Sequence, residues 1–220
     1  MSPYHATRTM HPLLAKYLTE LAAHPLRTKA ITTGILCFLQ EVLASNLAGV
    51  PPKKASKDAP FISQVLARAH IDSKALKMAI YGFLVSAPLG HFLVGLLQKA
   101  FAGKTSLKAR IAQIVANNLL VAPITVSAYL ASMAIIGGVR SLEGVKNTVK
   151  DGFLSVIRIT WVTSPLSLTI AQKFIPVELW VPFFNSITFV LGTYFNFRMK
   201  KIRMKKEKER AKGDADRKEL

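Results

Sequence analysis

Apolar and charged positions are segregated into long blocks along this chain. One uncharged block runs from Leu179 to Phe197, and nineteen residues of helix cover about 28 Å, close to the hydrocarbon thickness of a bilayer. Trp180 lies near one end of the block and Tyr194 near the other, where amphipathic aromatic rings favour the headgroup level. Basic residues follow directly from Arg198. This pattern predicts a membrane-spanning helix with a sharply marked end.

Other apolar blocks along the chain have the same character. We expect spans at about 31–50, 78–97, 111–137 and 178–197. The block 153–174 is also apolar, but Arg158 lies near its start and Pro165 lies inside it, so we treat it as a marginal or re-entrant segment. The sequence therefore predicts an all-α integral membrane protein. Its membrane bundle, over residues 31–197, would contain four clear transmembrane helices plus this marginal segment.

The segments outside the apolar blocks are basic. Residues 1–30 form an amino-terminal segment whose leucines recur at helical spacing, which predicts an interfacial amphipathic helix; a mitochondrial presequence would look similar. Between the blocks, we expect a polar linker at Lys53 to Lys77 and loops at Phe101 to Arg110 and Arg140 to Lys150. Residues 198–220 form a tail that alternates basic and acidic side chains, typical of a solvated helix.

Lysine and arginine counts orient the chain in the membrane. With either four or five spans, the side that holds the tail carries more basic residues, which places the tail in the cytosol. The four-span and five-span alternatives place the amino terminus on different sides of the membrane. The excess of basic residues on the tail side is larger with five spans.

Composition narrows the class of protein. A net charge of +18 and a pI near 10.2 would suit a nucleic-acid binder, but no recognition motif accompanies the charge, so we expect no nucleic-acid partner. Cys37 is the single cysteine, which excludes an internal disulfide and a thiolate metal site. Motifs for metal ligation, phosphate loops and nucleophiles are missing. We therefore expect no catalytic residue, no metal, no cofactor and no enzyme activity.

Polar side chains inside the apolar blocks are candidates for lining a pore. Glu41 is the only carboxylate deep within any expected span, so it should face the bundle or a water-filled space. Hydrogen bonding between packed helices is the alternative role for such groups. Small residues four apart form a stripe suited to close helix packing. The pore-lining candidates are Gln40, Glu41, His91, Asn117, Asn118, Arg158 and Asn185, and the packing stripe is Gly82, Ser86 and Gly90.

Several motifs in this order resemble one protein family. YGFLVSAPLGHF, HPLRTKAITTGIL and the aromatic ending GTYFNF are three of them, and Trp161, Pro165, Phe174 and Pro176 form a further signature. Together they are similar to the Mpv/PMP-type family of peroxisomal and mitochondrial inner-membrane proteins, closer to the branch of the peroxisomal 22-kilodalton membrane protein. Ser164 before Pro165 departs from the tryptophan that many members carry there, and the linker from Lys53 is longer than usual.

The resemblance implies a function as well as a fold. It implies a pore-forming protein that passes small hydrophilic metabolites across the peroxisomal membrane, with the mitochondrial inner membrane as the alternative location. The implied partners are the lipid bilayer, small solutes, a possible second copy of the chain and the peroxisomal membrane-protein import machinery. The competing hypothesis is a membrane organiser or tether that recruits partners through its basic tail.

Overall fold

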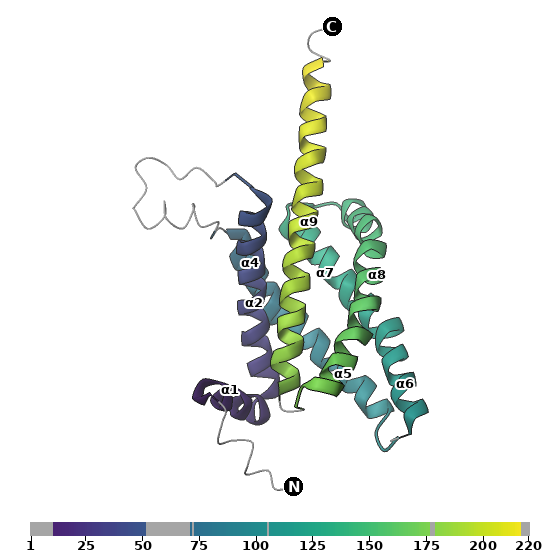
Figure 1. The fold of residues 1–220 in the computed structure, drawn as a ribbon. Coiled ribbons are helices and arrows are strands. Elements are labelled where there is room, and N and C mark those ends of the chain that lie inside the picture. Colours follow the sequence, from purple (N-terminus) through teal and green to yellow (C-terminus); the bar gives the residue numbers. More distant parts are fainter. Residues whose placement is uncertain (1–10, 52–70, 72, 105, 177–178, 217–220) are drawn as a thin grey trace.

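The computed structural model describes residues 11–51, 71, 73–104, 106–176 and 179–216, and its regular structure there is entirely helical. Helix α1 (Pro12–Ala23) lies across one end of the bundle (Figure 1). After a break at His24, helix α2 (Pro25–Ala48) begins with its proline in the first turn, where the missing N–H costs nothing. Gly49, with φ of 66°, ends α2 in the left-handed conformation that glycine adopts readily.

The next two rods each contain a π turn. The first consists of α4 (Ser73–Tyr81), the π turn η2 (Gly82–Ser86) and α5 (Ala87–Ala100). The second consists of α6 (Leu107–Ala116), η3 (Asn117–Val121) and α7 (Ala122–Ile136). In both, a proline follows the π turn by two residues, at Pro88 and Pro123. Because proline lacks an N–H and its ring clashes with the preceding turn, a π turn accommodates it without ending the helix.

Helix α8 (Leu142–Phe174) is one helix of 33 residues that passes through Pro165. The expected loop from Arg140 to Lys150 is therefore wrong beyond Ser141. Ser141 caps the helix, since its hydroxyl oxygen accepts a hydrogen bond from the Gly144 N–H at 3.1 Å. Helices also begin inside the other two connections, at Ser73 and at Leu107, while most of the linker lies outside the described residues.

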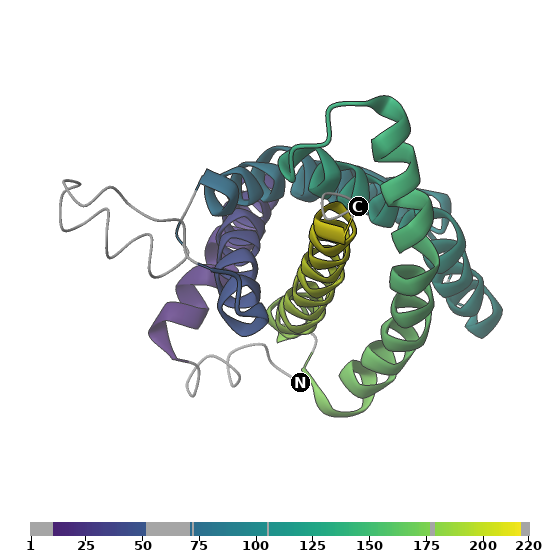
Figure 2. The ribbon, with the colours of Figure 1, turned by 90° about the horizontal axis from the view of Figure 1, so that it is seen from above.

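Helix α9 (Trp180–Asp216) has 37 residues, a length of about 55 Å. It continues well beyond the end of the bundle (Figure 1), and the view from above shows it inside the ring of the other helices (Figure 2). Apolar side chains of α7, α8 and α9 form one buried cluster: Ala122, Val126, Leu130, Val156, Ile157 and Phe195. A second cluster joins α2 to α4 through Cys37, Met78 and Tyr81. Helix α9 packs against α7 and α8 through the first cluster, and it also contacts α2.

Four helices in the described part of the chain are long and apolar enough to cross a membrane: Pro25–Ala48, Ser73–Ala100, Ile111–Ile136 and Leu142–Ala171. The fourth covers the block treated above as marginal. Helix α9 is not in this group, because Asn185, Thr193 and Asn196 lower its mean hydropathy. The central helix is therefore more polar than the helices around it.

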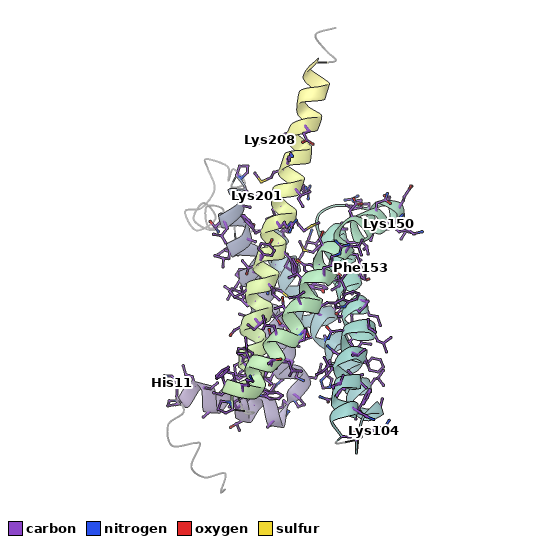
Figure 3. All side chains as sticks on the ribbon, turned by 45° about the vertical axis from the view of Figure 1, so that its right-hand side comes forward. His11, Lys104, Lys150, Phe153, Lys201 and Lys208 are labelled. Carbon is purple, nitrogen blue, oxygen red and sulfur yellow. The ribbon has the colours of Figure 1, made fainter. Side chains whose placement is uncertain are left out.

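The chain runs the length of the bundle five times, through α2, α4–α5, α6–α7, α8 and α9 (Figure 1). Consequently His11 and Lys104 lie at one end, whereas Lys150, Lys201 and Lys208 lie at the other (Figure 3). The two ends of the described chain are on opposite sides of the bundle.

Candidate functional site

Polar side chains of α9 gather on the face that it turns to α2 and α7. Positions 185, 193, 196 and 200 fall within about a quarter of the helix circumference, since each residue advances the helix by about 100°. We call this set the polar seam. Its members are Asn185, Thr193, Asn196 and Lys200 of α9, Gln40 and Glu41 of α2, and Tyr129 of α7.

The charged end of the polar seam is a cluster around Glu41. Lys200 Nζ lies 2.5 Å from Glu41 Oε1, and Lys74 Nζ lies 3.1 Å from the same oxygen. The Glu41 side chain is 1% exposed, that of Lys200 9% and that of Lys74 24%. A buried carboxylate is tolerated only when cations or hydrogen bonds compensate it. This cluster therefore joins α2, α4 and α9 where α9 leaves the bundle.

The middle of the polar seam is made of hydrogen bonds. Gln40 Nε2 donates to the Thr188 carbonyl of α9 at 3.1 Å, and the Tyr129 hydroxyl donates to Asn196 Oδ1. Gly192 makes the first of these bonds possible, because a Cβ there would lie 2.5 Å from Gln40 Nε2. Polar contacts of this kind substitute for water where helices pack in a membrane.

The opposite end of the polar seam reaches the amphipathic helix. Asn185 Nδ2 donates to the Tyr17 hydroxyl of α1 at 3.3 Å, and the Trp180 indole donates to the Ile175 carbonyl at 3.0 Å. The first contact joins α1 to α9. The second joins the start of α9 to Ile175, the residue that follows α8.

Three buried polar atoms of the polar seam have no hydrogen-bond partner within the described structure. They are Glu41 Oε2, Thr193 Oγ1 and Asn196 Nδ2. Buried groups of this type normally bind ordered water or a ligand. The described residues hold no group of three His, Cys, Asp or Glu side chains placed for a metal ion. The polar seam can therefore accept water or a hydrophilic solute.

The structure divides the pore-lining candidates into two groups. Gln40, Glu41 and Asn185 lie in the polar seam, although at different heights. The other four belong to other helices. His91 is half-buried on α5, Asn117 and Asn118 are half-buried in η3, and Arg158 is exposed on α8.

The family-signature residues lie around the α8 region. Trp161 Nε1 donates to the Asn118 carbonyl at 2.8 Å, which ties α8 to η3. Pro165 is exposed within α8, and Phe174, 74% exposed, ends that helix. Pro176 stands in the connection to α9. These residues shape the path of the chain and do not contribute to the polar seam.

The small-residue stripe contacts α2 at one end only. A Cβ at Gly82 would lie 2.7 Å from the Thr33 carbonyl and 3.0 Å from Cys37 Sγ, so this glycine sits at a close backbone contact. A Cβ at Gly90 would meet nothing within 4 Å, and Ser86 is half-buried.

Sequence reasoning missed the partners of the polar seam. Glu41 pairs with Lys200 and Lys74, and neither lysine is among the pore-lining candidates. From the sequence, Lys200 is predicted to belong to the solvated basic tail, because it follows the apolar block. One signal existed: Lys200 stands four residues after Asn196, on the same face of the helix.

The chain is similar in sequence to several known membrane proteins. The model of the Mpv17 / PMP22 family matches residues 137–196. The chain is 52% identical to the Woronin body membrane protein wscA of Aspergillus fumigatus over 191 residues, which cover 87% of this chain and 78% of that protein. It is 45% identical over 201 residues to the Woronin sorting complex protein of Neurospora crassa, covering 91% of this chain and 61% of that protein's length.

More distant relatives carry other names. The chain is 32% identical to peroxisomal membrane protein 2 of Bos taurus over 182 residues, which cover 82% of this chain and 86% of that protein. No solved structure matches the chain significantly.

Proposed function

We propose that this chain, which belongs to the Mpv17/PMP22 family of membrane proteins, is a non-enzymatic organiser that recruits protein partners to an organelle membrane. The observation that carries this proposal is the path of α9. This helix runs without a break from Trp180 inside the bundle to Asp216 well outside it. A rigid helix rooted in the bundle presents a partner surface at a fixed place above the membrane.

The interior of the bundle supports the same function. Helix α9 occupies the position in which a single-chain pore would need a lumen (Figure 2), and the Glu41 cluster ties it to α2 and α4. Four of the seven pore-lining candidates lie away from the polar seam. Such an arrangement suits a rooted scaffold better than an open channel.

The names of the relatives are consistent with a role in assembly. One fungal relative is called a Woronin sorting complex protein and another a Woronin body membrane protein. Two further relatives, from Bos taurus and Arabidopsis thaliana, are called peroxisomal membrane proteins. These likenesses support our proposal that the chain lies in the membrane of a peroxisome or Woronin body, with the mitochondrial inner membrane as the alternative. We further propose five spans, with the projecting part of α9 in the cytosol.

The experiment is a truncation after Met204, which removes the projecting helix but keeps Lys200 and Arg203 against the bundle. Proteins that co-purify with the chain from organelle membranes are quantified for the full-length and truncated forms. We expect the truncated chain to remain in the membrane after carbonate extraction and to lose its partners. A matched control exchanges Lys205 and Glu209, an exposed pair 3.9 Å apart, by Lys205→Glu with Glu209→Lys, which keeps the net charge. Equal partner recovery from truncated and full-length chains would refute the organiser.

A pore is the second candidate function, and one observation favours it. The partnerless atoms Glu41 Oε2, Thr193 Oγ1 and Asn196 Nδ2 lie on one helix–helix seam inside the bundle. Water or small hydrophilic solutes would satisfy these atoms, and the charged side chains of the polar seam would determine its ion selectivity.

Conductance of the purified protein in planar bilayers tests the pore. If the polar seam conducts, Glu41→Gln shifts the reversal potential toward anions, whereas Glu20→Gln, which changes an exposed carboxylate on α1, leaves it unchanged. Unchanged reversal potentials in both variants would remove Glu41 from any conducting path.

A further inference from the structure

One side of α8 carries an exposed charge at a place where the other candidate spans expose only apolar side chains. Three apolar segments of those spans expose no polar side chain: 31–43, 80–96 and 111–135. Helix α8, in contrast, exposes Arg158 within its apolar part. We call the surrounding surface the outward face of α8, and its residues lie within about a third of the helix circumference. They are Leu154, Ser155, Arg158, Val162 and Leu166.

Arg158 has no partner in the part of the chain that the structure describes. It makes neither a hydrogen bond nor an ion pair there. The carboxylate that precedes it on the same helix, Asp151, is seven residues away and forms no ion pair with it. Its neighbours on the outward face are mostly apolar, since Leu154 and Leu166 are each 57% exposed and Val162 is 69% exposed. The guanidinium therefore stands alone on an otherwise largely apolar surface.

The position of Arg158 along α8 places this charge well inside the span. The candidate span Leu142–Ala171 has sixteen residues before Arg158 and thirteen after it. Arg158 also follows Phe153 by five residues, and Figure 3 shows Phe153 further into the bundle than Lys150. Long basic side chains reach the headgroups by snorkelling from positions near helix ends, whereas ionisable groups deeper in a membrane pair with one another. Arg158 consequently requires an anionic partner from outside this chain.

We propose that the outward face of α8 binds a membrane-spanning helix of another protein, which presents a carboxylate to Arg158. Leu154, Val162 and Leu166 supply the apolar contacts of such a pair, and the small Ser155 allows close approach beside the charge. An arginine and a carboxylate form charge-assisted hydrogen bonds, which are stronger than neutral ones.

A second copy of this chain does not have the required carboxylate. Glu41 is the only carboxylate deep within an expected span. Its side chain is 1% exposed and already contacts Lys74 and Lys200. The charge of Arg158 thus indicates a partner of different sequence. The projecting part of α9 takes no part in this surface, so the inference does not depend on the organiser proposal.

The test uses a synthetic leucine-rich membrane helix with one glutamate at its centre and a matched peptide with glutamine there. Full-length protein carries a donor dye on Leu142→Cys, a position that is 90% exposed at the start of α8, in a Cys37→Ala background. Protein and acceptor-labelled peptide are combined in phosphatidylcholine vesicles, and energy transfer is measured against peptide density. We expect the glutamate peptide to bind about tenfold more tightly than the glutamine peptide. Equal binding would show that lipid headgroups satisfy Arg158 and would overturn the proposal.

Variants of α8 assign the effect to Arg158. Arg158→Gln should abolish the preference for the glutamate peptide, and it should fold because the exposed side chain has no contact to lose. Lys173→Gln is the matched control, since it removes an exposed cation at the end of the same helix and should keep the preference. Arg158→Glu should reverse it, favouring a peptide with lysine at its centre. A preference that survives in Arg158→Gln, or fails to reverse in Arg158→Glu, would contradict the assignment.

Discussion

Glu41 shows at the scale of one residue how a charge is kept inside this bundle. Its position could be predicted from the sequence, because it is the only carboxylate deep in an expected span and must avoid lipid. Its partners could not be predicted. Lys200 lies 159 residues further along the chain, and no periodicity states which helix becomes the neighbour of which.

Replacing Glu41 by glutamine should strongly destabilise the protein. The change leaves the buried ammonium of Lys200 without the Glu41 carboxylate and removes one contact of Lys74, which should lower the free energy of unfolding by about 3 kcal/mol. Unfolding of the purified protein in mixed micelles measures the effect. The control is Glu20→Gln, which removes an exposed carboxylate 2.7 Å from Arg27 and should cost less than about 1 kcal/mol. Similar costs in the two variants would contradict the role given to Glu41.

A second single-residue prediction concerns Gly192. Gly192→Ala should displace the Gln40 amide and break its bond to the Thr188 carbonyl, lowering the free energy of unfolding by about 1–3 kcal/mol. Gly95→Ala is the control, because a Cβ there would meet nothing within 4 Å. The same unfolding measurement applies, and an unaffected Gly192→Ala would mean that the Gln40 bond adds no stability.

At the scale of helices, sequence reasoning succeeded where apolar length decides the structure. It predicted spans around 31–50, 78–97 and 111–137, and the structure has long helical segments in these regions. It failed at the start of α8, because the polar residues after Arg140 resemble a loop. Two helix signals were nevertheless present: Ser141 at the cap position and Glu143 in the first turn.

The contact between η2 and α2 gives a prediction at this scale. Gly82→Ala should push the two helices apart, because the new Cβ would meet the Thr33 carbonyl and not only flexible side-chain ends. We expect a loss of about 1–3 kcal/mol in unfolding free energy. Gly90→Ala, on the same stripe but without neighbours, should be neutral or more stable by up to about 1 kcal/mol, since alanine favours helix. If both variants behave alike, the close packing at Gly82 is unimportant.

At the scale of the whole molecule, an uneven number of passes through the bundle separates the two ends of the chain. The counts of basic residues indicated the side of the membrane on which the tail lies, but they did not decide the side of the amino terminus. The tail side carries the excess of basic residues with either four or five spans. The central place of α9 was also beyond the sequence. Hydropathy indicates how well a helix tolerates contact with lipid. It does not indicate which helix the others enclose, as they enclose α9 here.

Cysteine labelling tests this separation directly. In a Cys37→Ala background, Leu13→Cys and Lys208→Cys place one thiol at an exposed position at each end of the bundle. A membrane-impermeant maleimide added to sealed vesicles should label these two variants from opposite sides. The unmodified chain should resist labelling from either side, because Cys37 is only 8% exposed. Labelling of both engineered thiols from one side would establish an even number of spans.

The ion pair between Glu41 and Lys200 also determines when the helix bundle can complete its assembly during synthesis. A ribosome makes Glu41 long before Lys200, so α2 exists for most of synthesis without its main partner helix. Helix α9, which is polar for a spanning segment, likewise depends on α2, whose Gln40 amide donates to the Thr188 carbonyl of α9. Assembly is therefore complete only when the last spanning helix joins the first. A chain that stops before Lys200 would leave Glu41 without the nearer of its two lysine partners, a feature by which cellular quality control could recognise the unfinished protein.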